Sequence, residues 1–218
     1  MKNMSLDNIV NLLCKVPNES VAFDFDGTIV NCEIRQVEVL RSILRRKDIN
    51  INNFNFENWW SFKINGSNTN NALIKLQINK NIAAEISQEW VSIIENSEWL
   101  DLDTLRPEIL YLFKELKKMN KTIYIITARK SEYNFYNQIR KLPINIYVEK
   151  SIVVNPSKSI EEKKEILLTL KPSFFIGDTE NDYYSAIESG VNFIGMKNGQ
   201  RSKQYLSNLG VVQFIDNY

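Results

Sequence analysis

Short apolar segments alternate with helical segments along most of the chain, and this alternation restricts the possible folds more than any other feature of the sequence. The apolar segments are too short for buried helices and are rich in β-branched and aromatic residues, so they predict strands. Several are apolar on both faces, which is typical of parallel strands covered by helices on each side. The candidate strands are Val21–Phe25, Thr122–Ile126, either Ile144–Val148 or Ile152–Val154, Ser173–Ile176, Asn192–Gly195 and Val211–Ile215, the last at an edge of the sheet.

The segments between these strands have the pattern of amphipathic helices. Pro107 suits a first helical position, and Ser159 with Glu162 three residues later predicts a capping box. Strands and helices in this order predict an α/β fold with a Rossmann-like, doubly wound parallel sheet as its core. The expected helices are Pro107–Met119, Ser131–Leu142 and Ser159–Leu170.

One stretch, residues 31–100, interrupts this order. It contains no convincing strand, and segments such as "EIRQVEVLRSILRRK" and "NIAAEISQEWVSIIENSEWL" predict helices. Roughly 70 residues are enough for a small domain. We therefore predict an α/β core formed by residues 1–30 and 101–218, and a small all-helical domain, residues 31–100, inserted after the first strand.

The composition excludes several classes of function. The sequence has 27 Lys and Arg against 26 Asp and Glu, so its net charge of +1 does not indicate nucleic acid or a membrane surface as a partner. It contains no histidine, which rules out Ser-His-Asp and Cys-His catalytic groups and leaves acid–base chemistry to carboxylates, Lys, Tyr or metal-bound water. There is no apolar run of membrane-spanning length and no signal-peptide core. We expect a cytoplasmic protein in which Cys14 and Cys32 are free thiols.

Two acids at the end of the first predicted strand are candidate site residues. Because residues i and i+2 of a strand point the same way, Asp24 and Asp26 emerge together near its carboxyl end. Gly27 permits a turn with positive φ and lets a ligand approach the backbone, and Thr28 can support that turn. An unpaired buried carboxylate is costly, so a metal ion, a lysine or backbone donors must compensate.

Two later strands end with polar residues at the same edge of the sheet, where ligands bind in open α/β folds. The segment "TIYIITARK" contains Thr127 and then Arg129, for which a phosphate contact and a salt bridge both stay open. The segment "FFIGDTEND" supplies Asp178 and Asp182, which are four residues apart and face one point if a helix begins near Asn181.

A basic segment, "SKSIEEKKEILLTL", precedes the last of these strands. Lys163 shares a helix face with apolar residues, so we expect it to face the sheet, with Lys158 and Lys164 as alternatives. Four carboxylates and a hydroxyl from three strand ends suit Mg²⁺, which prefers oxygen ligands. A carboxylate held by Mg²⁺ and Lys can attack phosphorus while the cations neutralise the transferring phosphoryl group.

Together these motifs resemble those of the haloacid dehalogenase-like superfamily. The sequence "DFDGT" at Asp24–Thr28, Thr127 at a strand end, a helix lysine and "GDTEND" at Gly177–Asp182 follow the order of that superfamily's four motifs, over about residues 20–199 apart from the insert. A helical insert between the first two motifs resembles the cap of C1-capped phosphatases, such as phosphoglycolate phosphatases and β-phosphoglucomutases.

The resemblance implies a role for each site residue. Asp24 would be the nucleophile that forms an aspartyl-phosphate, and Asp26 would protonate the leaving group and then activate water. Thr127 and Lys163 would hold the phosphoryl oxygens. Relatives that cleave carbon–halogen bonds lack the second acid, so Asp26 favours phosphate chemistry. The implied ligands of Mg²⁺ are Asp24, Asp26 through its carbonyl, Asp178 and Asp182.

The predicted insert also contains a candidate for substrate recognition. Its segment "WWSFKINGSNTNNAL" resembles the specificity loop of capped relatives, which reaches over the substrate. Lys63 is the predicted substrate contact there, whereas Trp59 and its aromatic neighbours are expected to form the core of the insert. The other predicted substrate-binding residues are Gly27, Thr127 and Arg129.

The predicted function is that of a Mg²⁺-dependent phosphatase acting on a small phosphorylated metabolite, as a monomer or homodimer, with no nucleic-acid or membrane partner. A phosphomutase would use the same residues but form an isomer instead of free phosphate. A phosphorylatable module like a response-regulator receiver also groups an Asp, a Thr and a Lys around Mg²⁺. Receivers, however, place adjacent acids after the first strand and lack a helical insert.

Overall fold

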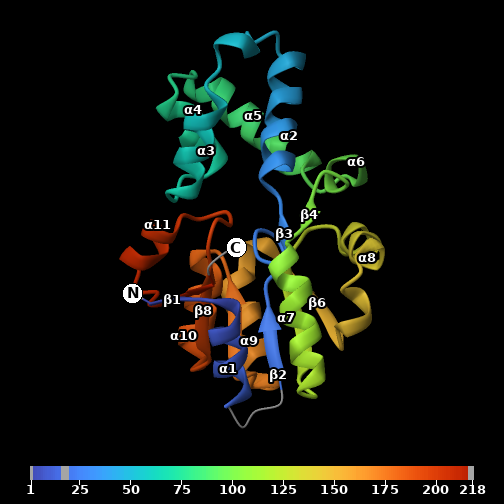
Figure 1. Ribbon diagram of the computed structural model, residues 1–218. Coiled ribbons are helices and arrows are strands. Elements are labelled where there is room, and N and C mark those ends of the chain that lie inside the picture. The colour runs from blue at the N-terminus through green and yellow to red at the C-terminus, as the bar shows by residue number, and fades with distance from the viewer. Residues whose placement is uncertain (1, 16–19, 216–218) are drawn as a thin grey trace.

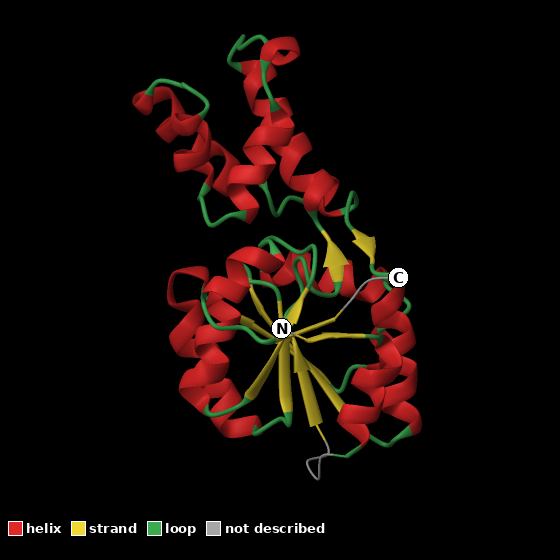
Figure 2. Cartoon of the chain, turned by 60° about the vertical axis from the view of Figure 1, so that its left-hand side comes forward, coloured by secondary structure: helices red, strands yellow, loops and turns green. Residues whose placement is uncertain are grey.

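The structure is a computed structural model in which residues 2–15 and 20–215 are described. A seven-stranded sheet stands between two layers of helices, and a further group of helices lies beyond one end of it (Figure 1, Figure 2). Every neighbouring pair of strands in this sheet is parallel. In spatial order the strands are β1 (Lys2–Met4), β9 (Gln213–Ile215), β8 (Asn192–Met196), β7 (Phe174–Gly177), β2 (Ser20–Phe23), β5 (Thr122–Ala128) and β6 (Lys150–Val154).

Helices cover both faces of the sheet because successive side chains of a strand point to opposite faces. Val21 and Phe23 of β2 belong to one hydrophobic cluster, with α1, α7 and α8, whereas Ala22 between them belongs to another, with α9, α10 and α11. This arrangement confirms the predicted doubly wound α/β fold. The helices are α1 (Leu6–Cys14), α7 (Pro107–Lys118), α8 (Glu132–Lys141), α9 (Ser159–Leu170), α10 (Glu180–Ser189) and α11 (Lys203–Asn208).

The edges of the sheet differ from the prediction. β6 is the second of the two proposed alternatives, and the first contains a short 3-10 helix, η2 (Asn145–Tyr147). The prediction that Val211–Ile215 lies at an edge is wrong, because β1 pairs with β9 and forms that edge itself. A strand of three residues is too short to show any periodicity in the sequence.

The predicted capping box at the start of α9 is also wrong. A 3-10 helix, η3 (Pro156–Lys158), leads into α9, and the helix has no side-chain cap. Ser159 Oγ instead accepts a hydrogen bond from Asn181 Nδ2 at 2.8 Å, and Glu162 Oε2 accepts one from the backbone N–H of Asn155 at 2.8 Å. Ser159 therefore joins α9 to α10.

Residues 33–100 form the helical unit, which has a hydrophobic cluster of its own around the fully buried Trp59 (Figure 1). Two short strands that the sequence did not predict, β3 (Val30–Asn31) and β4 (Thr104–Leu105), pair antiparallel and connect this unit to the sheet. None of the described helices is both long enough and apolar enough to cross a membrane. The helices of the unit are α2 (Glu33–Arg46), η1 (Ile51–Asn53), α3 (Phe56–Ile64), α4 (Thr69–Lys75), α5 (Lys80–Ile93) and α6 (Ser97–Leu100).

Candidate active site

The parallel strands bring three predicted carboxylates to one point. β2 lies between β7 and β5, so Asp24 after β2 is close to Asp178 after β7, and the Asp24 N–H donates to Ile176 O at 2.8 Å. Asp182 lies in the first turn of α10 and faces the same point. One carboxylate oxygen from each of Asp24, Asp178 and Asp182 lies within 4.8 Å of the others. The predicted convergence is therefore present for these three side chains, whereas the carboxylate of Asp26, the fourth one predicted, is bound by arginines instead.

Lys163 is the lysine that reaches this cluster. Its Nζ donates to Asp24 Oδ1 at 2.7 Å and to Asp182 Oδ1 at 2.6 Å, and the residue is buried. Burial alone would lower the pKa of Lys163, but the carboxylates of Asp182 and Asp24 raise it above its usual value. Of the two alternatives, Lys158 is exposed and Lys164 pairs with Glu188 at 3.0 Å.

The carboxylate cluster has the donor set of a hard divalent cation. Burial raises the pKa of Asp24 well above its usual value, Asp182 raises it further, and Lys163 opposes both effects only in part. Burial and the Asp182 charge likewise raise the pKa of Asp178 to about 7. The single positive charge of Lys163 does not balance the charges of three carboxylates, so the cluster can accept a further cation. All the ligand atoms are oxygens, which fits Mg²⁺.

The backbone packs tightly around Asp178. Thr28 Oγ1 donates to Asp178 Oδ1 at 2.9 Å, and the backbone N–H of Gln200 donates to Oδ2 at 2.5 Å. Gly27 has a φ of +83°, and a Cβ on it would lie 2.1 Å from Asp178 Oδ2. Only glycine therefore fits at position 27, because any side chain would displace the carboxylate.

Asp26 is held by two arginines. Arg129 binds both of its carboxylate oxygens, with Nη2 at 2.7 Å from Oδ1, and Arg35 of α2 binds Oδ1. Arg35 Nε also donates to Asp103 Oδ1 at 2.9 Å. Burial raises the pKa of Asp26, but the charges of Arg129 and Arg35 outweigh that effect and leave it below its usual value. Of the two roles open for Arg129, the salt bridge is the one observed.

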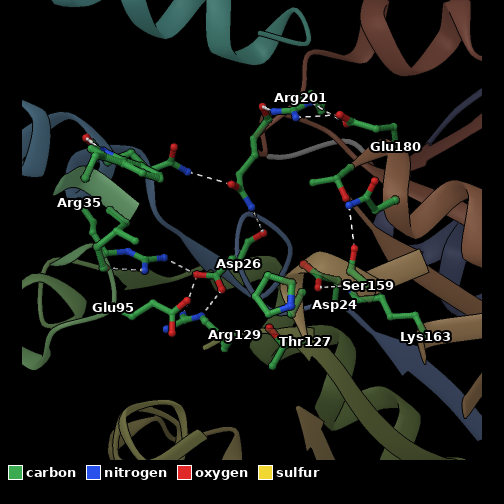
Figure 3. Close-up of a pocket in the computed structure, with 18 residues that line it drawn as sticks. Asp24, Asp26, Arg35, Glu95, Thr127, Arg129, Ser159, Lys163, Glu180 and Arg201 are labelled. Atoms are coloured by element: carbon green, nitrogen blue, oxygen red, sulfur yellow. Dashed lines mark hydrogen bonds and ion pairs between the residues drawn. The ribbon is translucent and has the colours of Figure 1, made fainter. Parts of the chain in front are cut away.

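Two donors at the site have no hydrogen-bond partner in the described structure. Thr127 Oγ1 at the end of β5 and Arg129 Nη1 are both buried, yet nothing accepts from them. An unpaired buried donor is costly unless a ligand satisfies it. Both side chains line a pocket of about 290 Å³ together with Asp24, Asp26 and Lys163 (Figure 3).

Lys63 lies one layer behind this pocket. Its Nζ donates to Thr69 Oγ1 at 3.1 Å and lies 4.7 Å from the ring centroid of Trp90, and it is Trp90 that lines the pocket. Burial, together with the Arg201 charge, lowers the pKa of Lys63 to about 8. A direct contact between Lys63 and a substrate stays a prediction.

A family model of the haloacid dehalogenase-like hydrolases matches residues 21–196. The chain belongs to this family. No curated protein matches the sequence significantly.

Solved structures share the fold of this haloacid dehalogenase-like hydrolase. A Clostridium difficile protein described provisionally as a phosphatase is 18% identical, with a TM-score of 0.73 over 94% of this chain and 96% of the other. The haloacid dehalogenase-like family protein SP0104 from Streptococcus pneumoniae is 19% identical, with a TM-score of 0.72 over 92% and 94%. A predicted phosphoglycolate phosphatase from Haemophilus somnus is 15% identical, with a TM-score of 0.67 over 93% and 96%. At these identities the likeness establishes a common fold.

Several residues at the site of this hydrolase were not found from the sequence. Gln200 Nε2 donates to the Asp26 carbonyl at 2.9 Å, and Gln200 Oε1 accepts from Gln36 of α2 at 2.9 Å. Arg35 and Glu95 line the pocket from the helical unit. No local motif marks these residues, because they meet the site only through the packing of the helical unit on the sheet. One of the local features could have been predicted from the sequence: Thr-x-x-Asp at the start of α10 is the pattern of a capping box, which Thr179 and Asp182 form.

Proposed function

We propose that the protein is a Mg²⁺-dependent phosphatase that hydrolyses a small phosphorylated metabolite through an aspartyl-phosphate on Asp24. One observation carries the proposal: the buried Asp24 carboxylate is hydrogen-bonded by Lys163 in the pocket that also contains the unpaired Thr127 hydroxyl. The arrangement supports the proposal because a carboxylate, a cation and an unpaired donor surround the volume that a phosphoryl group needs. The phosphatase names of structural neighbours agree with it.

In the first half-reaction, an Asp24 carboxylate oxygen attacks phosphorus and the bond from phosphorus to the leaving oxygen breaks. Lys163 and Thr127 bind the equatorial phosphoryl oxygens, on which negative charge is spread in the transition state. When bound by Asp24, Asp178 and Asp182, Mg²⁺ supplies further positive charge for that purpose. Asp26 gives the leaving oxygen its proton.

In the second half-reaction, a water molecule attacks phosphorus and the bond between phosphorus and Asp24 breaks. Asp26 takes the proton of that water, so the cycle returns both acids to their starting states. In the structure Asp26 is an ionised partner of Arg129 and Arg35. To act as an acid it must therefore turn from this pair toward the pocket and take up a proton from solvent before the first half-reaction. Since Arg35 belongs to the helical unit, movement of that unit as a cap would accompany the turn.

The test is the release of inorganic phosphate from a simple ester such as p-nitrophenyl phosphate, with Mg²⁺ and with EDTA. We expect turnover only with Mg²⁺, and no turnover by Asp24→Asn. Asp101→Asn, which removes an exposed acid paired with Lys141, is the matched control and should retain activity. Turnover by Asp24→Asn would contradict the role of Asp24, and a sugar phosphate converted to its isomer without free phosphate would indicate a phosphomutase.

A further inference from the structure

We infer that the enzyme acts on phosphate esters whose organic part carries no second negative charge, and that Glu95 is the residue that excludes such a charge. This inference rests on the proposed phosphatase activity and adds to it the class of substrate. It concerns the part of the pocket that lies beyond the reacting phosphoryl group.

Glu95 lies between α5 and α6 of the helical unit and reaches down to the sheet. Its carboxylate accepts from the backbone N–H of Lys130 at 2.9 Å and from that of Ser131 at 2.8 Å. Its backbone carbonyl accepts from Asn134 Nδ2 at 2.8 Å, which fixes the backbone there. Ser131 is the N-cap of α8, and the free N–H groups at a helix start favour an anion.

This position adjoins the reacting group. Lys130 and Ser131 do not line the pocket themselves, but they directly follow Thr127–Arg129, which do, and Glu95 lines the pocket from the helical unit. Figure 3 shows Glu95 pointing into the same pocket as Asp26 and Arg129. The backbone donors that would suit a carboxylate or a second phosphate on the substrate are therefore already occupied by a carboxylate of the protein.

The cations of the pocket are occupied as well. Among the described residues, every Lys and Arg that lines the pocket has an acidic partner. Glu95, in contrast, is bound by backbone N–H groups, so its negative charge remains in the pocket. A second anion on the substrate would meet that charge and find no cation that lacks an acidic partner. Arg129 Nη1 is still an unpaired donor, but Asp26 already offsets the charge of its guanidinium. The pairs are Arg35 with Asp26 and Asp103, Arg129 with Asp26, Lys163 with Asp24 and Asp182, and Arg201 with Glu180.

The remaining contacts from the helical unit are uncharged. Gln36, Trp90 and Ile94 line the pocket, and they suit hydroxyl groups and carbon. The pocket of about 290 Å³ suits a small organic part. The substrate class is thus a small phosphorylated alcohol that is neutral or positively charged apart from its phosphate, and phosphoglycolate falls outside it.

The test compares phosphoglycolate with glycolamide phosphate, which differ only in a carboxylate oxygen replaced by an amide nitrogen. With Mg²⁺ present, we expect the wild-type kcat/KM for the amide to exceed that for phosphoglycolate by about tenfold or more. Glu95→Gln, which keeps an oxygen acceptor for the N–H groups, should reduce this ratio to within about threefold of one. Glu95→Asp keeps the charge and should keep the preference.

A control removes the same charge from the same helical unit. Glu85→Gln lies on α5, where the carboxylate pairs with Lys47 at 3.1 Å on the surface, and it should leave the ratio unchanged. A wild-type ratio at or below one overturns the inference. So does a Glu95→Gln variant that slows both esters equally, because Glu95 would then only dock the helical unit. If neither ester is turned over, calorimetric binding to the wild type decides instead: tighter binding of the amide supports the inference, and equal or tighter binding of phosphoglycolate overturns it. The proposed function itself fails only if p-nitrophenyl phosphate is not turned over either.

Discussion

Lys163→Met tests the electrostatics of the site most directly, because one substitution removes the cation between two buried carboxylates. Lys163 Nζ lies 2.7 Å from Asp24 Oδ1 and 2.6 Å from Asp182 Oδ1, and their side chains are 7% and 0% exposed. Breaking a buried ion pair from one side costs about 3–5 kcal/mol, because the charge left behind is unpaired. We expect a loss of this size in the free energy of unfolding at pH 8, without Mg²⁺.

The loss should depend on pH in a known direction. The pKa of Asp24 is already raised in the folded protein, and without Lys163 it rises further. The folded state then holds a proton that the unfolded state releases above about pH 4. Stability therefore falls as the pH rises from there through the folded-state pKa. Urea unfolding should show a larger difference between variant and wild type at pH 8 than at pH 5.

Lys164→Met is the matched control. The adjacent lysine pairs with Glu188 on the surface, with side chains 37% and 49% exposed, and such pairs contribute about 0–1 kcal/mol. Phosphate release should fall at least about a hundredfold in Lys163→Met and stay near the wild-type rate in Lys164→Met. If the two variants lose equal stability, or if Lys163→Met retains activity, then Lys163 is not the cation that balances Asp24.

Two further predictions concern backbone fit and titration. Gly27→Ala places a Cβ 2.1 Å from Asp178 Oδ2, so it should lower stability by about 2–4 kcal/mol and abolish thermal stabilisation by Mg²⁺. Gly190→Ala is the control: its φ is +72° and no atom lies near the added Cβ, so it should lower stability by only about 1 kcal/mol and keep the stabilisation by Mg²⁺. If both glycine variants behave equally in thermal melts, close packing around Asp178 is contradicted. The pKa of Lys63 in the folded protein, about 8, lies below its value in the unfolded chain, about 10.4. Between these two pH values the unfolded state binds more protons than the folded state. The stability of the wild type should therefore rise with pH in this range, by up to about 3 kcal/mol. Lys63→Met should lack this rise and be the more stable protein at pH 7. The free energy of unfolding of both proteins is measured with urea at several pH values. If it changes with pH in the same way in both, the burial of a charged Lys63 is contradicted.

The part of the site that lies on the sheet could be predicted because it depends on local rules. Side chains two residues apart on a strand point the same way, which puts Asp24 and Asp26 on one side. Parallel strands have their carboxyl ends at the same edge of the sheet, so Asp178 lies close to Asp24. Lys163 followed from the apolar face that it shares on α9. Each of these inferences needs only a short segment and a general property of α/β sheets.

The contacts made by the helical unit could not be predicted in the same way. Arg35 and Asp103 are 68 residues apart, and Gln36 and Gln200 are 164 apart, so their meeting depends on how the unit packs against the sheet. Local patterns carry no information on that packing. The same reason explains the incorrect capping box, because Ser159 is buried against α10 and its hydroxyl is used there.

The pairing of β3 with β4 has a consequence for how such an enzyme can change. The chain departs from the sheet along β3 and comes back along β4, with Val30 opposite Leu105 and Asn31 opposite Thr104. Facing residues of an antiparallel ladder are about 5 Å apart, so the whole helical excursion starts and finishes at nearly one point. Any insert whose own ends lie that close could be grafted at this junction without disturbing the sheet. In the proposed function, selectivity could then be exchanged as a module while the phosphoryl chemistry on the strands stays the same.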